Sequence, residues 1–267
     1  MFLSFPRALR FLRPLAVLVA FLLSALFSAA EPPPGAAPAA LHLRVRRVAP
    51  NVFVHTSFHY FPGTVVPVPS NGLIVSTSKG ALIVDMAWGP EQTLELLRWV
   101  ADSLHQRVRL VVVSHAHEDR LSGLAVLHAN KIKVYSTPLT AKRAARLPFG
   151  VPTPAIRPYT LIRAGRTRLE LFFPGPGHAP DNIVAWLPKQ RVLFGGCLVK
   201  EEAAPDLGNI EDANLKLWPA AVRKLWARYP QVEVLVPGHG PWGGPNLLAH
   251  TLKLLRAAPP QAPNGPE

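Results

Sequence analysis

The sequence contains a single cysteine, Cys197, among 267 residues. A lone cysteine excludes an internal disulfide, so no disulfide framework can hold this fold together. The thiol of an exported protein needs a reason to escape oxidation, and ligation of a metal would be such a reason. A buried, inert thiol is the alternative, and composition alone favours it. Cys197 therefore becomes informative only if other metal-ligating residues accompany it.

Acidic residues are also scarce, because 16 Asp and Glu stand against 29 Lys and Arg, for a formal net charge of +13. Arg7, Arg10 and Arg13 contribute three of these charges, which leaves +10 for the rest of the chain. Such a balance raises the possibility of nucleic-acid binding. The basic residues, however, form only short clusters, with no aromatic–basic stacking motif and no recognition-helix signature. We interpret the excess charge as a solvated basic surface and expect no nucleic-acid partner.

An apolar run occupies residues 14–27, directly after the three arginines and before the small residues Ser28, Ala29 and Ala30. This order is typical of a cleavable secretory signal peptide. A retained membrane anchor is the alternative, since the run is not much shorter than the roughly 20 residues that span a bilayer. The small residues at its end and the proline-rich stretch that follows favour cleavage. We expect a signal peptide at 1–30, a periplasmic protein, and no stable membrane insertion after cleavage.

The remaining chain divides by composition into a linker, a domain and a tail. Residues 31–42 are rich in proline and alanine, which is typical of a linker, and residues 259–267 resemble them. No internal linker interrupts residues 43–258, and an apolar fraction of 49% is ample for a large core. We therefore expect one domain over 43–258, followed by a flexible tail at 259–267.

Within this domain, short β-branched runs alternate with helical patterns. The expected strands lie at 52–55, 73–76, 81–85, 108–113, 132–135, 168–173, 182–187, 191–194 and 232–236. The expected helices lie at 91–104, 137–146, 214–228 and 247–256. Two successive halves of strands followed by helices indicate an α/β fold, with sheets packed face to face and helices outside.

The segment Ser114-His115-Ala116-His117-Glu118-Asp119-Arg120 is the first candidate for a functional site. It follows a buried strand, and loops at strand ends commonly build sites. Two histidines and a carboxylate within five residues suit Zn²⁺, but a single His-x-His is weak evidence because surface histidines also pair by chance.

Three further candidate ligands occur in the same context, at the end of an apolar strand and beside glycines that let the backbone turn. These are His178 in 174–178, Cys197 after Gly195-Gly196, and His239 in 237–240. One such placement would be unremarkable, whereas four at strand ends indicate a shared site on one edge of the sheets. The other histidines lack this context and are interpreted as surface or packing residues.

The six residues and the phrases around them resemble the class B, subclass 1 metallo-β-lactamases. The likeness extends over about 52–255, and the matching phrases are PGPGHAPDN at 174–182, GGCLVK at 195–200, LGN at 207–209, DAN at 212–214 and VPGHG at 236–240. The resemblance implies a four-layer αβ/βα sandwich with a zinc site at one edge of the two sheets. It also implies two Zn²⁺ per chain, the first held by His115, His117 and His178, the second by Asp119, Cys197 and His239.

The same resemblance implies an enzyme that hydrolyses the amide of penicillins, cephalosporins and carbapenems, a carbapenemase that confers antibiotic resistance as a monomer. Zinc-bound hydroxide would be the nucleophile, oriented by Asp119, and Asn209 would help to stabilise the oxyanion. Lys200 would bind the carboxylate that most β-lactams carry beside the ring nitrogen, although it could equally be one more surface lysine. Residues 56–69 would form a hairpin over the site, with substrate contacts from Phe58, His59, Tyr60 and Phe61, or would simply be a packed hairpin tip.

Other members of the wider superfamily resemble His-x-His-x-Asp-His with a bridging aspartate. Here Arg120 stands in place of that last histidine and Cys197 in place of the aspartate, which disfavours thioesterases and lactonases without excluding another lactam or ester substrate. Arg120 is expected near Cys197 without binding metal, and Glu118 is expected to add negative charge near the second zinc. A zinc-binding protein without catalysis is the alternative from another functional class, but it would need neither Lys200 nor Asn209.

Overall fold

The computed structural model describes residues 43–259 of the 267-residue chain. The expected signal peptide, the linker and all but the first residue of the expected tail lie outside the described residues. Among the described residues, no helix is long and apolar enough to cross a membrane.

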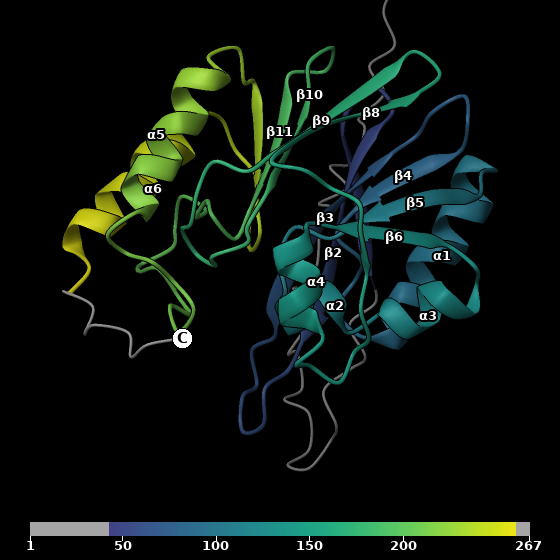
Figure 1. Ribbon diagram of the computed structural model, residues 1–267, viewed down its shortest axis with the longest axis horizontal. Helices are drawn as coiled ribbons and strands as arrows, with labels where there is room; N and C mark the ends of the chain where they lie inside the picture. The colour runs from purple at the N-terminus through teal and green to yellow at the C-terminus, as the bar shows by residue number, and fades with distance from the viewer. Residues whose placement is uncertain (1–42, 260–267) are drawn as a thin grey trace, which may run out of the picture. The chain divides into compact units, whose positions relative to one another are not determined.

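Residues 43–259 form two β-sheets (Figure 1). The first sheet runs in the order β1 (Arg44–Ala49), β2 (Val52–His59), β3 (Val68–Val75), β4 (Ala81–Val84), β5 (Val108–Val112), β6 (Lys133–Ser136), β7 (Thr153–Pro154). The second runs in the order β12 (Val234–Pro237), β11 (Val192–Gly196), β10 (Val184–Leu187), β9 (Thr167–Phe172), β8 (Tyr159–Ala164). Strands β4 to β7 run parallel to one another, and β11 runs parallel to β12, whereas all the other neighbouring pairs are antiparallel.

Helices cover the outer face of each sheet (Figure 1). Their bounds are α1 (Pro90–Leu104), α2 (Glu118–Leu121), α3 (Leu124–Ala129), α4 (Pro138–Ala144), α5 (Trp218–Arg228) and α6 (Asn246–Ala257). Helices α1 and α3 pack on the first sheet, and α5 and α6 pack on the second. The result is the four-layer αβ/βα arrangement, so the expected fold is confirmed.

The alternation of side chains along β4 explains how the layers are held together. Leu82 and Val84 belong to the core between the two sheets, whereas Ala81 and Ile83 belong to the core between the first sheet and its helices. Successive side chains of a strand point to opposite faces, so a strand covered on both sides is apolar throughout. This is why the β-branched runs at 81–85 and 108–113 predict strands covered on both faces.

Most expected elements are confirmed, but several differ in extent. Strands β1, β7 and β8 and the short helices α2 and α3 were not expected. Strand β1 carries three arginines, and β8 mixes exposed polar residues with apolar ones, so neither shows an apolar run. The helix expected at 214–228 begins only at Trp218. The carbonyl oxygen of Asn214 accepts the backbone N–H groups of Leu217 and Trp218 in a turn, and Pro219 lies in the first turn of the helix.

The candidate ligands follow the carboxyl ends of these strands. His115 lies three residues after β5, Cys197 directly after β11 and His239 two residues after β12. Because β11 and β12 are parallel, their carboxyl ends lie at the same edge of the sheet, where loops can converge on one site.

Candidate metal centre

Two buried carboxylates hold the loop that carries the His-x-His pair. Asp85, at the end of β4, accepts hydrogen bonds from the backbone N–H and the hydroxyl of Ser114, both at 2.7 Å. Asp181 accepts the backbone N–H of Ala116 at 2.9 Å. Asp85 itself has a φ of +59°, a left-handed conformation that aspartate tolerates better than most residues and that often marks functional sites. The loop is thus fixed on either side of His115.

Three imidazole nitrogens, two from this loop and one from His178, lie close together. His117 Nδ1 lies 3.0 Å from His115 Nε2 and 3.1 Å from His178 Nε2. Tetrahedral ligands on a zinc ion with Zn–N bonds of 2.0–2.1 Å would lie about 3.3 Å apart, so this spacing fits one shared ion. Burial holds the pKa of His115 and of His178 well below the ordinary value, which keeps both rings neutral with lone pairs free for a metal.

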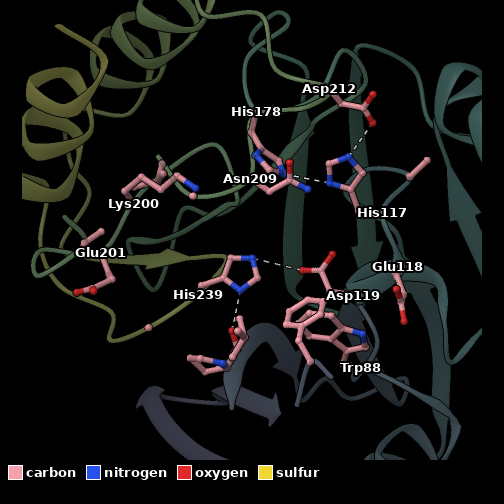
Figure 2. Close-up of a pocket in the computed structure, with 18 of the residues that line it drawn as sticks. Trp88, His117, Glu118, Asp119, His178, Lys200, Glu201, Asn209, Asp212 and His239 are labelled. Carbon is pink, nitrogen blue, oxygen red and sulfur yellow. Dashed lines mark hydrogen bonds and ion pairs between the residues drawn. The ribbon is translucent and has the colours of Figure 1, made fainter. Parts of the chain in front are cut away.

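A second group of ligand atoms lies beside the first. His239 Nε2 is 3.2 Å from Cys197 Sγ and 3.5 Å from Asp119 Oδ2 (Figure 2), and the sulfur lies 4.0 Å from the same carboxylate oxygen. The opposite ring nitrogen of His239 lies 2.7 Å from the carbonyl oxygen of Pro69, which sets the ring orientation. Gly238 is required here, because a Cβ at that position would lie 2.5 Å from the Cys197 sulfur.

Arg120 is fully buried beneath the second group. Its Nη2 lies 2.9 Å from both Asp119 Oδ2 and Cys197 Sγ, and its Nη1 lies 3.4 Å from the carboxylate of Asp85. Burial opposes the charge, but these anionic neighbours raise the pKa of Arg120 above its ordinary value. The expected approach of Arg120 to Cys197 is therefore present in the structure.

The donor types fit zinc. Burial raises the pKa of the Cys197 thiol to about 11, so without a metal the sulfur is protonated and inert near neutral pH. One set of three imidazoles and one set of carboxylate, thiolate and imidazole are both ligand combinations that zinc accepts. His115, His178 and Cys197 also lie close enough to share an ion, so the two sets adjoin.

Four of the six candidate ligands, His117, Asp119, His178 and His239, line a cavity of about 970 Å³, which is the size of a small-molecule site. His115 and Cys197 are buried and are not among its lining residues. Trp88 and Phe61 line it on the side of the β2–β3 hairpin, and Lys200 and Asn209 line it on the side of the loop after β11. In the view of Figure 2, Lys200 and Asp212 lie on opposite sides of the histidines. Glu118 is exposed at the rim, where it adds negative charge.

The structure separates the four aromatic residues expected to contact substrate. Phe61 lines the cavity, whereas Phe58, His59 and Tyr60 are not among its lining residues. Phe58 lies under the guanidinium of Arg44, at 5.1 Å from ring centroid to carbon. His59 stacks on Trp88 with ring centroids 4.6 Å apart, and Phe61 packs edge-on against both rings. His59 thus supports two residues that do line the cavity.

Sequence reasoning missed the acidic residues that hold the ligands. His117 Nε2 lies 2.9 Å from Asp212 Oδ2, which also receives the guanidinium of Arg143. Asp85 and Asp181 hold the loop backbone as described above. A signal did exist for Asp85, because it stands directly after an apolar strand, the same placement that singled out the candidate metal ligands.

The chain was compared with known protein families and proteins. A family model described as the metallo-β-lactamase superfamily matches residues 65–239. A metallo-β-lactamase type 2 from Bacillus sp. (strain 170) is 42% identical over 214 residues, which cover 80% of this chain and 82% of that protein. A metallo-β-lactamase type 2 from Bacteroides fragilis is 34% identical over 213 residues, which cover 80% of this chain and 85% of that protein.

Solved structures similar to this chain are also metallo-β-lactamases. A metallo-β-lactamase from Pontibacter korlensis has a TM-score of 0.77 and 46% identity, covering 81% of this chain and 100% of that one. The metallo-β-lactamase FIM-1 from Pseudomonas aeruginosa, solved in a mono-zinc form, has a TM-score of 0.76 and 32% identity, covering 82% of this chain and 97% of that one. The likeness to solved structures therefore covers about four-fifths of this chain, and the match to the family model includes all the candidate ligands.

Proposed function

The chain belongs to the metallo-β-lactamase superfamily, and we propose that it hydrolyses the amide bond of β-lactam antibiotics with two zinc ions bound in this cavity. Penicillins, cephalosporins and carbapenems are the proposed substrates, and their hydrolysis would confer resistance. One observation carries the proposal: the six candidate ligands lie close together in two adjoining groups, and four of them line a cavity that Lys200 and Asn209 also line.

The proposed ligands of the first ion are His115, His117 and His178, and those of the second are Asp119, Cys197 and His239. Zinc supplies a Lewis acid and lowers the pKa of bound water toward 7. The three neutral imidazoles leave that ion its full charge, whereas the carboxylate and thiolate offset the charge of the other. The two sets therefore suit different parts of the reaction.

Asp119 is the proposed residue that orients the attacking water and holds a proton. Burial acts to raise the pKa of Asp119, but Arg120 and the neighbouring histidines keep it below the ordinary value, so the carboxylate is ionised. Its Oδ2 faces both Arg120 Nη2 and the hydroxyl of Ser70, the latter at 3.4 Å. These contacts give the carboxylate a single orientation toward the cavity.

Asn209 and Lys200 are the proposed groups that bind the substrate's oxygens. Asn209 Oδ1 accepts the backbone N–H of Glu211 at 2.9 Å, which leaves the amide N–H₂ available to donate to the oxyanion. Lys200 is anchored at its backbone N–H by the Thr251 hydroxyl, and its ammonium lies 5.6 Å from the centroid of the Trp218 ring. A cation held at the cavity wall suits the carboxylate beside the lactam nitrogen.

We expect Lys200→Ala to lower kcat/KM for β-lactams by about 10- to 100-fold, mainly through KM, because a charge-assisted contact to the substrate is lost. Lys200→Arg is the matched control that keeps the charge and should recover part of the loss. The methyl ester of the same β-lactam lacks the carboxylate, so its turnover should be insensitive to the substitution. An equal loss with the ester would show that Lys200 acts elsewhere than on that carboxylate.

The proposed function is tested by following the absorbance of a carbapenem, a penicillin and a cephalosporin with the purified protein. We expect hydrolysis with added zinc, its loss on chelation and its recovery when zinc is restored. Bound zinc without turnover of any of the three would overturn the proposal, and would favour another lactam or ester substrate or a zinc-binding role.

The proposal includes export, because the pattern at 1–30 is that of a signal peptide and the proposed substrates act outside the cytoplasm. On this proposal the mature protein is a periplasmic monomer, neither inserted in the membrane nor bound to nucleic acid. Cell fractionation combined with N-terminal sequencing of the mature protein tests the location and the cleavage site. Recovery of uncleaved protein in the membrane fraction would support the anchor alternative.

A further inference from the structure

His117 differs from the other two histidines of the first site in what holds it. His115 Nδ1 lies 3.0 Å from the hydroxyl of buried Ser114, and the ring of His178 is itself almost fully buried. His117 is one-fifth exposed, and within residues 43–259 its outer nitrogen bonds only to Asp212, a carboxylate that is itself 37% exposed. A half-exposed carboxylate on a loop is a weak anchor unless something fixes it in turn.

Arg143 is the residue that fixes Asp212. Its Nη2 contacts the same Oδ2 atom that faces His117, and it is the other charged partner of Asp212 within residues 43–259. Arg143 lies in the last turn of α4, which begins at the Thr137 cap. The contact brings α4 against the loop before α5, two segments that are 69 residues apart in the sequence.

Arg143 also faces Asp181, the carboxylate that holds the backbone of Ala116. Arg143 Nε lies 3.7 Å from Asp181 Oδ1, and neither of these two buried atoms has a hydrogen-bond partner among the described residues. Opposite charges attract more strongly in a buried place than in water. Arg143 therefore lies between two carboxylates, one of which sets the ring of His117 and the other the backbone just before it.

We infer that Arg143 is a positioning residue for the first metal site. By orienting Asp212, it keeps the proton on Nε2 of His117 and directs the lone pair of Nδ1 toward the point shared with His115 and His178. Carboxylates that accept the outer N–H of a metal-bound histidine fix its tautomer and orientation, and losing such partners typically costs about 10- to 100-fold in metal affinity or activity. The inference rests on the proposed function only in taking these three histidines as metal ligands.

Two other roles for Arg143 make different predictions. A surface ion pair would contribute little, and its removal would leave metal binding unchanged. Arg143 also lines the cavity. If its role were to contact the substrate directly, its removal would raise KM without changing metal affinity. Metal affinity measured without substrate therefore separates the positioning role from both.

The experiment measures binding of zinc and of cobalt(II) by Arg143→Leu in competition with a chromophoric chelator. We expect affinity at the three-histidine site to fall by about 10- to 100-fold, with altered cobalt ligand-field bands. The thiolate-to-cobalt charge-transfer band, which reports the Cys197 site, should keep its intensity and its titration midpoint. Arg143→Lys should recover part of the loss, because it retains a cation but not both contacts.

Lys142→Leu is the matched control, since it removes the same charge from the neighbouring, exposed position of α4. It should leave both metal sites unchanged.

Asp212→Asn combined with Arg143→Leu should bind metal about as weakly as Asp212→Asn alone, because Arg143 acts through that carboxylate. Unchanged affinity and an unchanged cobalt spectrum in Arg143→Leu would overturn the inference, as would equal weakening of both sites together with a lower melting temperature of the metal-free protein. If Arg143→Leu shows the expected fall in metal affinity but the parent protein hydrolyses no β-lactam, the proposed function is rejected and this inference is retained.

Discussion

Cys197→Ser is expected to remove the second metal and to lower kcat/KM for β-lactams by more than about 100-fold. The loss exceeds the cost of removing an outer hydrogen-bond partner because a ligand itself is lost. A serine hydroxyl cannot supply the thiolate that offsets the ion's charge beside Asp119. It can, however, still accept the hydrogen bond from Arg120 that the sulfur accepts at 2.9 Å, so we expect the fold to be retained.

The measurement combines metal content, cobalt(II) spectroscopy and steady-state kinetics. Since Cys197 is the single cysteine of the chain, any thiolate-to-cobalt band must come from this residue. The band should disappear in Cys197→Ser while the ligand-field bands of the three-histidine site remain, and bound zinc should fall from two ions to one. A folded variant that kept full turnover would show that the second ion has no part in catalysis.

The candidate ligands could be singled out in the sequence because each of the four segments that carry them follows an apolar strand. His115 lies three residues after β5 and Cys197 directly after β11, and the apolar character of both strands is plain in the sequence. The parallel pairing of β11 with β12 then brings Cys197 and His239 to one edge. The positions of these residues at strand ends were therefore sufficient to predict that they lie close together, whereas their division into two metal sites came from the family resemblance and stays a prediction.

The residues that hold the ligands could not be predicted in the same way. Arg143 stands in a basic cluster with Lys142 and Arg146, and the sequence gives no reason why this one of the three cations should contact Asp212. Helix α4 has only seven residues, too few for its periodicity to distinguish a buried from an exposed side. Asp212 lies on a loop, where its partner is set by tertiary contacts between segments distant in the sequence.

The aromatic hairpin shows a related difficulty. The run from Phe58 to Phe61 is uniformly aromatic, which predicts contact with an apolar ligand. The structure instead directs Phe58 to Arg44 on the neighbouring strand and His59 to Trp88, and leaves Phe61 at the cavity. Side chains of a strand alternate between its two faces, so consecutive aromatic residues cannot all face one site.

Arg120→Met is expected to lower the free energy of unfolding of the metal-free protein by about 3–5 kcal/mol, the cost of leaving buried carboxylates without their partner. For a domain of this size that corresponds to a fall of roughly 10 °C in melting temperature. The guanidinium is fully buried and contacts both Asp85 and Asp119, as well as the carbonyl oxygen of Asn71 at 2.6 Å. Methionine keeps most of the side-chain length, so the loss would come from the charge and hydrogen bonds rather than from a cavity.

Chemical denaturation in the presence of chelator measures this loss without the added stability of bound metal. Arg120→Lys is the matched control and should lose less, because it keeps the charge while giving up some of the contacts. Asp85→Asn in the Arg120→Met background should recover part of the loss, since one uncompensated carboxylate is removed and the amide can still accept the Ser114 N–H and donate to its hydroxyl. Additive effects of the two substitutions would show that Arg120 does not neutralise Asp85.

With both thiolate and carboxylate ligands charged, the buried groups around the second site carry three negative charges: Asp85, Asp119 and Cys197. Arg120 and one divalent ion together balance them. Removing Arg120 leaves a net negative charge even with the ion bound, so Arg120→Met should remain less stable than the parent when zinc is present.

A zinc-loaded variant as stable as the parent would mean that Asp85 takes up a proton when Arg120 is absent, which its raised pKa of about 6 in the parent already favours. In that case the loss of stability should return as the pH is raised, because deprotonating the buried carboxyl then costs free energy in the folded protein but not in the unfolded chain.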